Sequence, residues 1–202
     1  MKEQYYDELL NIETTKEQAG FHKSFHYHRY EPTPYSALEV LFENYKLKSS
    51  DHVVDFGCGK GRLNFFINYL FDATVIGVEM DEDFYEDAME NRACYLESFK
   101  NSEDRIRFYR CLAQEYEIQP EENRFYFFNP FSIQIFMKII NNILRSVEEH
   151  PREIELVLYY VSDDYIYFLE NQSSFELKKE VILPGLYEHN SDERFLIYRL
   201  AY

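Results

Sequence analysis

The chain has 202 residues, of which 46% are hydrophobic and 29% are charged, values that fit one globular domain. Its 37 Asp and Glu residues outnumber 21 Lys and Arg residues, and the formal net charge is −16. Because binding to a phosphate backbone depends on Lys and Arg, we expect no nucleic-acid partner. The sequence has no apolar run of about 18 residues and no signal-like apolar stretch near its start, so we expect no membrane contact.

The three cysteines, at positions 58, 94 and 111, have no spacing typical of metal ligands. Unpaired cysteines are typical of a reducing compartment, so we expect a cytoplasmic protein. Aromatic residues reach 18% of the chain, with 19 Tyr, 18 Phe and no Trp. The core and the walls of any ligand site should therefore be built largely from Phe and Tyr.

Apolar periodicity predicts the elements of the first half of the chain. Prolines at 32 and 34 separate the polar and aromatic N-terminal residues from the remainder. The elements expected here, in chain order, are a helical segment within 1–30, a helix over 35–45, a strand over 52–56, a helix with the stripe Leu63, Phe66, Ile67 and Leu70, and a strand over 74–80.

The second half continues the alternation and ends in two strands. The elements expected here are a helix over 81–99, strands over 106–111 and 125–128, a helix capped by Ser132 with the stripe Phe136, Ile139, Ile140, Ile143, Leu144 and Val147, a strand over 154–161, and an antiparallel hairpin of 175–183 with 194–200. Strands separated by helical stretches predict an α/β sheet.

A glycine-rich turn follows the first expected strand. Gly57, Gly59 and Gly61 are spaced by single residues, whereas a dinucleotide-binding turn has the spacing G-x-G-x-x-G. Asp55 precedes the turn, where a carboxylate would repel phosphate and pair with an ammonium group. Glu79 ends the second expected strand. Both acids are thus placed at the carboxyl edge of a parallel sheet, where ligands bind.

This pair of motifs resembles the class I S-adenosylmethionine-dependent methyltransferases. The resemblance covers roughly residues 30–200 and implies a Rossmann-like three-layer sandwich with strand order 3-2-1-4-5-7-6, the seventh strand antiparallel and helices on both faces. It also implies that Asp55 lies near the methionine end of the cofactor and that Glu79 accepts hydrogen bonds from the ribose. The implied cofactor residues are Asp55, Gly57, Cys58, Gly59, Gly61, Glu79, Met80, Leu112 and Ala113.

One position departs from this family pattern. An acid after the third strand contacts adenine in many members, but Leu112 and Ala113 stand there. Backbone groups of these residues together with Gln114 could serve instead, since apolar and backbone contacts suffice for a planar base. Cys58 has no base beside it in the sequence, so packing is its simpler role. Lys60 and Arg62 are expected to interact with nearby acids or helix-end groups and not with phosphates.

Asn129-Pro130-Phe131 ends the fourth expected strand and is similar to the Asn/Asp-Pro-Pro-Tyr/Phe element of amino-group methyltransferases, one proline short. The resemblance implies that Asn129 and the backbone of Pro130 hold a substrate NH₂ group and that Phe131 stacks on the substrate. Alternatively, the three residues form a turn that ends a strand, with a buried Phe. The implied reaction is methyl transfer to a small molecule or a protein, with nitrogen as the candidate acceptor atom.

The N-terminal residues 1–35 are expected to form a cap on a methyltransferase domain of 36–202. Tyr30, Thr33 or Tyr35 could line the methionine end of the cofactor, or the prolines could simply fix a turn. His22, His26 and His28 suggest either a metal site or, more simply, packing; no metal is expected. The terminal hairpin could support a homodimer. Two other functions stay open: a non-catalytic cofactor-binding or docking protein, and an NAD(P)-dependent oxidoreductase.

Overall fold

The computed structural model describes residues 2–15, 31–129 and 131–201. Its seven strands form one sheet. They are β1 (His52–Phe56), β2 (Thr74–Glu79), β3 (Ile106–Arg110), β4 (Arg124–Phe127), β5 (Glu155–Tyr159), β6 (Phe175–Ile182) and β7 (Arg194–Leu200). The α-helices and short 3₁₀ helices between them are α1 (Lys2–Leu10), α2 (Tyr35–Asn44), α3 (Arg62–Phe71), α4 (Glu82–Ser98), η1 (Lys100–Ser102), η2 (Ala113–Glu115), α5 (Ile133–Glu149) and α6 (Asp163–Gln172).

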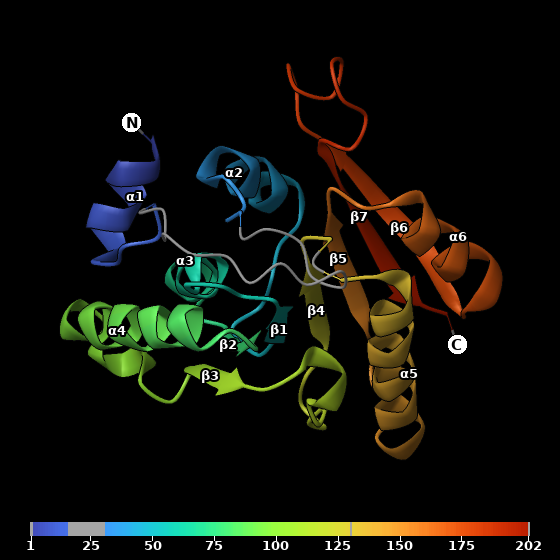
Figure 1. The fold of residues 1–202 in the computed structure, drawn as a ribbon, viewed down its shortest axis with the longest axis horizontal. Helices are drawn as coiled ribbons and strands as arrows, with labels where there is room; N and C mark the ends of the chain where they lie inside the picture. The colour runs from blue at the N-terminus through green and yellow to red at the C-terminus, as the bar shows by residue number, and fades with distance from the viewer. Residues whose placement is uncertain (1, 16–30, 130, 202) are drawn as a thin grey trace.

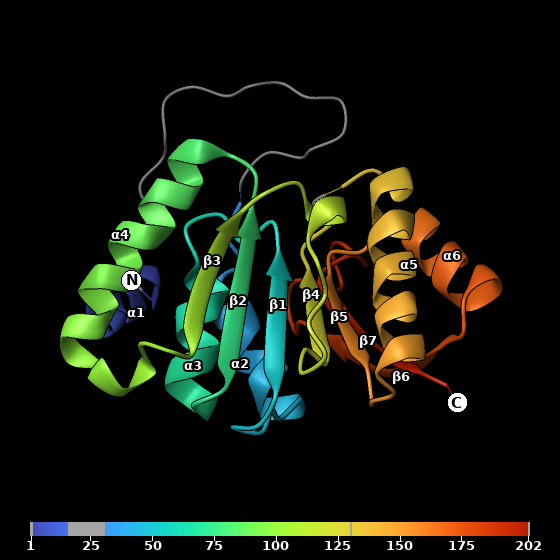
Figure 2. The same cartoon turned by 90° about the horizontal axis from the view of Figure 1, so that it is seen from below.

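The strand order is β3-β2-β1-β4-β5-β7-β6, as predicted. Neighbouring strands from β3 to β5 are parallel, and β7 is antiparallel to both β5 and β6. The carboxyl ends of the five parallel strands therefore meet at one edge of the sheet, which lies at the top in Figure 2. In open α/β sheets this edge is where ligands bind.

Both faces of the sheet are covered, and each face has its own hydrophobic core. Successive strand residues point to opposite faces, so Val53 packs in one core and Val54 in the other. The first core receives side chains from α1 to α4, and the second from α5 and α6. Figures 1 and 2 show α2 and α3 on one side of the sheet and α5 and α6 on the other. This is the predicted three-layer arrangement.

The N-cap residues of α4 and α5 differ in their hydrogen bonds. Asp81 is the N-cap of α4, and its carboxylate accepts hydrogen bonds from the backbone N–H groups of Asp83 (3.0 Å) and Phe84 (3.2 Å). Ser132 occupies the N-cap of α5 as predicted, but its hydroxyl is buried without a hydrogen-bond partner and makes no cap bond. The predicted stripe of α5 is buried except for Leu144, which is half-buried.

The structure adds one helix that the sequence pattern did not specify. Helix α6 lies between β5 and β6, begins after Ser162 and carries two acids in its first turn. Several predicted strands also end one residue later than the observed ones. β2 ends at Glu79 and β3 at Arg110, because the backbone there turns away into the loops at the carboxyl edge.

The N-terminal helix α1 packs on α2 and α3 through an aromatic cluster. The Tyr6 ring lies 4.7 Å from the Tyr35 ring and 5.1 Å from the Phe66 ring, measured between centroids. Leu10, at the end of α1, is fully buried. The N-terminal residues described here are thus part of the folded core. Their description as a separate cap over residues 1–35 stays a prediction.

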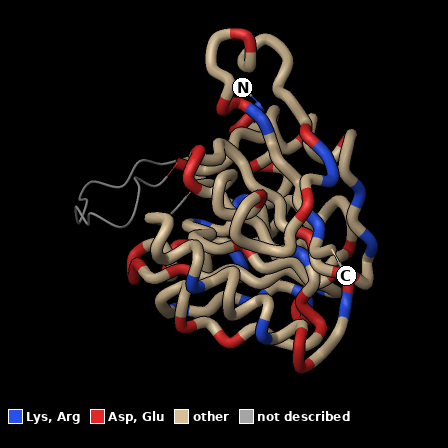
Figure 3. The backbone as a smooth tube through the Cα atoms, turned by 90° about the vertical axis from the view of Figure 1, so that its right-hand side faces the viewer, with Lys and Arg blue, Asp and Glu red and all other residues tan. Residues whose placement is uncertain are grey.

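Charged side chains on the sheet are mostly paired. Figure 3 shows basic positions interspersed with more numerous acidic ones. On the β6–β7 hairpin, Arg194 pairs with Glu180 (2.7 Å) and Arg199 with Glu176 (3.4 Å). Such pairs also protect the β6 edge from joining other strands. Within the described ranges no helix is long and apolar enough to span a membrane.

Candidate functional site

The glycine turn joins β1 to α3 in a conformation that favours glycine. Gly57, Gly59 and Gly61 have φ values of 81°, 54° and 83°, in the left-handed region that side chains disfavour. The backbone N–H groups of Gly57 and Cys58 donate to the carbonyl of Val78, at 2.8 Å and 3.2 Å, which fixes the turn against the end of β2. The glycine spacing is therefore set by the backbone path.

Cys58 points into the protein. Its side chain is buried, and its sulfur fills the space beside Gly77, where an added Cβ would lie only 2.7 Å away. Burial, with the nearby charges of Asp55 and Glu79, raises the pKa of this thiol well above its ordinary value. The packing role expected for the Cys58 side chain agrees with these contacts, although its backbone remains in the turn.

Glu79 is held tightly at the end of β2. Its carboxylate accepts hydrogen bonds from the backbone N–H groups of Gly59 (3.0 Å), Met80 (2.8 Å) and Asp81 (2.9 Å), and the side chain is 9% exposed. Burial raises the pKa of Glu79, while the three N–H donors act in the opposite direction. The sequence predicted Glu79 at this edge, but not its bond across to the glycine turn.

Asp55 is buried on the face of the sheet that α3 covers, and it is 4% exposed. With its amide oriented to suit both neighbours, Asn64 donates to the Asp55 carboxylate at 3.1 Å and accepts from the N–H of Gly77 at 3.2 Å. Burial, followed by the charge of Glu79, raises the pKa of Asp55 well above its usual range. Within the described ranges no Lys, Arg or His lies within ion-pair distance of Asp55.

The sequence did not predict two residues that lie beside Asp55, namely Asn64 and Tyr126. Asn64 is a polar residue on a mostly apolar helix, and that interruption is the signal that could have identified it. Tyr126 pairs with Asp55 in the β1–β4 register, and its hydroxyl lies 2.7 Å from the Thr33 hydroxyl. Thr33 thus reaches the strand beside Asp55, whereas the Tyr35 side chain is fully buried.

The expected adenine residues lie at the ends of β2 and β3. Met80 is 40% exposed, Leu112 is half-buried and Ala113, in η2, is buried. Gln114 follows directly, and its backbone carbonyl accepts a hydrogen bond from Asn142 on α5 (2.9 Å). The side-chain oxygen of Gln114 is buried and has no hydrogen-bond partner among the described residues. A buried acceptor without a partner suits a ligand with an N–H donor.

Two residues of the Asn-Pro-Phe element, Asn129 and Phe131, differ in burial. Asn129 is half-buried and has φ 39°, again in the left-handed region. Phe131 is 4% exposed, and its carbonyl accepts a hydrogen bond from Tyr165 at 2.6 Å. Its ring therefore packs in the core on the α5 side, while the half-buried ring near Asn129 in the chain is that of Phe128. Pro130 lies outside the described residues.

Arg62, the first residue of α3, connects the glycine turn to the N-terminal segment. Its guanidinium pairs with Glu3, donates to the Thr14 hydroxyl at 2.7 Å and lies 4.6 Å from the centre of the Tyr35 ring. Asp7 completes the contact by accepting hydrogen bonds from Thr14 and Tyr35. The expected interaction of Arg62 with an acid is confirmed, with a partner 59 residues away in the chain.

Lys60 makes a similar contact on the other side of the turn. Its ammonium group lies 3.1 Å from the Asp87 carboxylate on α4, and its own side chain is only 4% exposed. Asn91, one turn further along α4, donates to the backbone carbonyl of Lys60 and exchanges hydrogen bonds with the backbone of Glu13. The turn is thus held on both sides by contacts within the protein.

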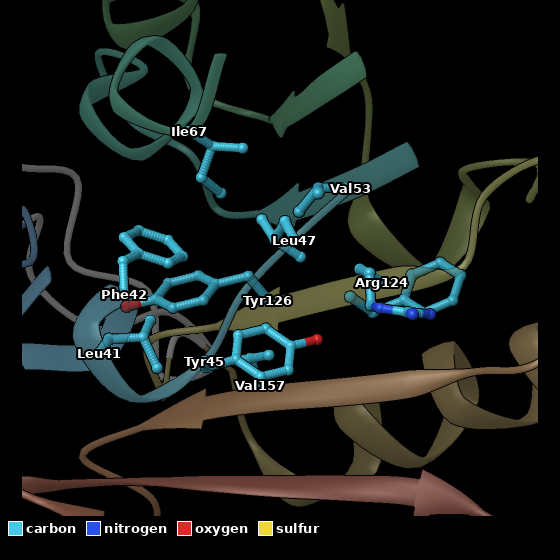
Figure 4. A pocket seen from close by; sticks show the side chains of 10 residues that line it. Leu41, Phe42, Tyr45, Leu47, Val53, Ile67, Arg124, Tyr126 and Val157 are labelled. Carbon is cyan, nitrogen blue, oxygen red and sulfur yellow. The ribbon is translucent and has the colours of Figure 1, made fainter. Parts of the chain in front are cut away.

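A small cavity lies away from this edge, between α2 and the sheet. Its volume of about 10 Å³ is close to that of one water molecule. Figure 4 shows its mostly apolar lining, with the Tyr45 hydroxyl and the Arg124 guanidinium to one side. Both groups contact Glu155, Tyr45 at 2.7 Å and Arg124 at 3.6 Å. This cavity is too small for a nucleoside and belongs to the packing of the core.

Other residues singled out from the sequence lie outside the described part of the chain. These are His22, His26, His28 and Tyr30. Among the residues that the structure does describe, no group of three His, Cys, Asp or Glu side chains is arranged to hold a metal ion. The three cysteines are free thiols.

Comparisons with known proteins agree with this arrangement. Residues 34–125 match a family model described as a methyltransferase domain. No curated protein sequence matches the chain. Among solved structures, an RNA methyltransferase from Salinibacter ruber in complex with S-adenosylhomocysteine is 19% identical, with a TM-score of 0.56 over 84% of this chain and 92% of that one.

Two further structures are similar in fold at lower identity. Phosphoethanolamine N-methyltransferase 1 from Haemonchus contortus is 12% identical, with a TM-score of 0.61 over 81% of this chain and 42% of that one. The pyocyanin biosynthetic protein PhzM is also 12% identical, with a TM-score of 0.60 over 83% and 55%. Residues 34–125 are thus similar to a methyltransferase domain, and the strand order of the sheet is that of a Rossmann-like methyltransferase fold.

Proposed function

We propose that this protein binds S-adenosylmethionine at the carboxyl edge of the sheet and transfers its methyl group to a nitrogen atom of a small molecule or a protein. The observation that carries the proposal is the carboxylate of Glu79, fixed by the N–H groups of Gly59, Met80 and Asp81 beside a turn whose positive φ values favour glycine. A fixed carboxylate next to exposed backbone is a suitable acceptor for a ribose diol.

Asp55 supplies a second recognition group. Buried carboxylates are normally paired, yet the described residues offer Asp55 an amide and no cation. The α-ammonium group of the cofactor would complete this pairing. Gln114 supplies a third, because its buried side-chain oxygen can accept a hydrogen bond from the adenine amino group. Met80, Leu112 and Ala113 provide the apolar surface around the base.

When bound, S-adenosylmethionine supplies a sulfonium methyl group that a nitrogen lone pair can attack. The protein's task is then mainly to align the acceptor. We assign this to Asn129, whose side-chain carbonyl would accept a hydrogen bond from the acceptor NH₂ and direct the lone pair toward the methyl group. The half-buried ring of Phe128 stands beside it in the chain. Because Phe131 is buried, we no longer assign it the stacking role.

The charge of the chain guides the choice of acceptor. A net charge of −16 opposes a long phosphate backbone, so we retain a small molecule or a protein segment and not RNA or DNA. In this proposal the N-terminal residues 1–35 form a cap beside the site. The cap is attached by the ion pair of Arg62 with Glu3 and by the hydrogen bond between Thr33 and Tyr126. The free thiols at 58, 94 and 111 agree with the proposed cytoplasmic location.

The test separates cofactor binding from chemistry. Calorimetry with S-adenosylhomocysteine should give tight binding, whereas NAD should not bind. Asn129→Ala should lower methyl transfer by about 100-fold, the typical loss of one preorganised polar contact, and leave cofactor affinity nearly unchanged. Asn171→Ala is the matched control, since this asparagine lies exposed on α6 and bonds only within its helix.

Three outcomes would contradict parts of this proposal. Tight NAD binding without binding of S-adenosylhomocysteine would favour an oxidoreductase. Cofactor binding without transfer of a labelled methyl group to any fraction of a cell lysate would favour a non-catalytic docking protein. Full turnover by Asn129→Ala would leave a methyltransferase whose acceptor is not positioned by this residue.

A further inference from the structure

Three aromatic rings meet where β4 and β5 end at the carboxyl edge of the sheet. The Phe128 ring centre lies 4.7 Å from that of Tyr159 and 6.4 Å from that of Tyr160, and the two tyrosine rings are 6.2 Å apart. Their planes are inclined to one another by 46° to 73°. We call these three residues the aromatic edge. Because their planes are inclined, the three rings do not stack in parallel.

The aromatic edge is firmly supported from behind. Tyr159 is 2% exposed and stacks on Phe195 at 4.5 Å, so it serves as the rear wall. Phe128 and Tyr160 are half-buried, so part of each residue is accessible. The Tyr160 hydroxyl accepts a hydrogen bond from Asn190 (2.7 Å), which lies in the loop between β6 and β7. Two of the three rings can therefore contact a ligand.

Backbone conformation marks the same place. Tyr160 has φ 52° and Asn129 has φ 39°, and each follows the end of one of two adjacent parallel strands. A bulky residue in the left-handed region is unfavourable and persists where the surrounding structure holds it. Both residues therefore lie at the carboxyl edge of the sheet, where the proposed function places the acceptor.

A carboxylate contacts one of the rings. The Glu193 carboxylate accepts a hydrogen bond from the Tyr159 hydroxyl at 2.6 Å. Burial, then Glu193, and to a smaller extent Tyr160 and the more distant charge of Glu31, raise the pKa of Tyr159. The neighbouring cation Arg194 is already neutralised by Glu180. The charged group that contacts the aromatic edge is thus a carboxylate, and its charge has the same sign as the negative faces of the rings.

We propose that the aromatic edge binds an organic ammonium group of the substrate, held against the faces of Phe128 and Tyr160. Aromatic faces attract cations, and attract them more strongly when carboxylates lie near and water is partly excluded. This inference rests on the proposed function for its place beside the methyl donor. It narrows the substrate to molecules or peptide segments that carry a cationic nitrogen.

The test compares choline with its uncharged isostere 3,3-dimethyl-1-butanol as probes. Titrations followed by ligand-detected NMR, with and without S-adenosylhomocysteine, should show choline binding at least about fivefold more tightly, which corresponds to about 1 kcal/mol. The choline N-methyl protons should shift upfield, because they lie over ring faces. A merely structural role of the rings would produce neither the preference nor the shift.

Variants locate the binding. Phe128→Leu and Tyr160→Leu should each weaken choline binding by about fivefold and reduce the upfield shift, whereas Tyr160→Phe, the matched control, keeps the ring and should retain both. Equal binding of the two probes, or choline binding unaffected by either leucine variant, would overturn the inference. Failure of S-adenosylhomocysteine to bind would instead overturn the proposed function, since the choline preference is also measured without it.

Discussion

Replacing Glu79 by glutamine tests the central contact of the site. Glu79→Gln keeps the size of the side chain but leaves one acceptor oxygen in place of two. In the structure the carboxylate accepts from Gly59 with one oxygen and from Met80 and Asp81 with the other. The glutamine oxygen can keep the pair from Met80 and Asp81, but its NH₂ group then faces the N–H of Gly59.

Two effects follow, and their sizes can be estimated. A hydrogen bond to a charged group contributes about 1.5–3 kcal/mol, so loss of one ribose contact should weaken S-adenosylhomocysteine binding by roughly 10- to 150-fold. The buried N–H of Gly59 loses its acceptor, which should lower the free energy of unfolding by about 1–3 kcal/mol. The variant should therefore fold and bind weakly.

The assay is calorimetric titration with S-adenosylhomocysteine, with thermal unfolding measured in parallel. Glu82→Gln is the matched control, because Glu82 begins α4 three residues later, is exposed and pairs only with Arg110 at the surface. It carries the same change of charge and should alter affinity by less than about twofold. A folded Glu79→Gln variant that binds as tightly as the parent would refute the ribose assignment and leave Glu79 as a residue that only fixes the turn.

Three further predictions concern pH and packing. Burial raises the pKa of Glu122 to about 7 from 4.5, so the folded state favours its protonated form. The free energy of unfolding should therefore fall by about 3 kcal/mol as the pH rises from about 4.5 to above 7. Urea denaturation at several pH values should show this fall in the parent protein and not in Glu122→Gln. Asp55 also has a raised pKa, and an ammonium group needs its ionised form; calorimetry should show S-adenosylhomocysteine affinity falling as pH falls, and Asp55→Asn should bind weakly at every pH. Gly77→Ala would place a Cβ 2.4 Å from the Phe108 ring and should destabilise the protein by about 1–3 kcal/mol in thermal unfolding. Gly185→Ala, with no atom within 4 Å of its Cβ, should lose only the roughly 1 kcal/mol of its positive φ; equal losses at both glycines would contradict the packing argument.

The sequence by itself determined the class of fold and the chemical frame of the site. Apolar periodicity is a local property, so it located nearly every strand and helix, while short polar stretches blurred the ends and left α6 unspecified. The glycine spacing requires a backbone path that few folds use, and all three glycines of the turn do have positive φ. Asp55 near the end of β1 and Glu79 at the end of β2 were placed at one edge because parallel strands end together.

The tertiary structure decided which side chains meet. Arg62 pairs with Glu3, and Thr33 with Tyr126, across 59 and 93 residues, and no local pattern encodes such partners. Phe131 shows the same limit: its neighbours in sequence suggested a ring facing the substrate, but packing against α5 and α6 buries it. Burial depends on what the rest of the chain places over a residue. The sequence can therefore predict the edge of the sheet at which a ligand is expected to bind. Only the packing of the folded chain determines which aromatic rings at that edge stay accessible.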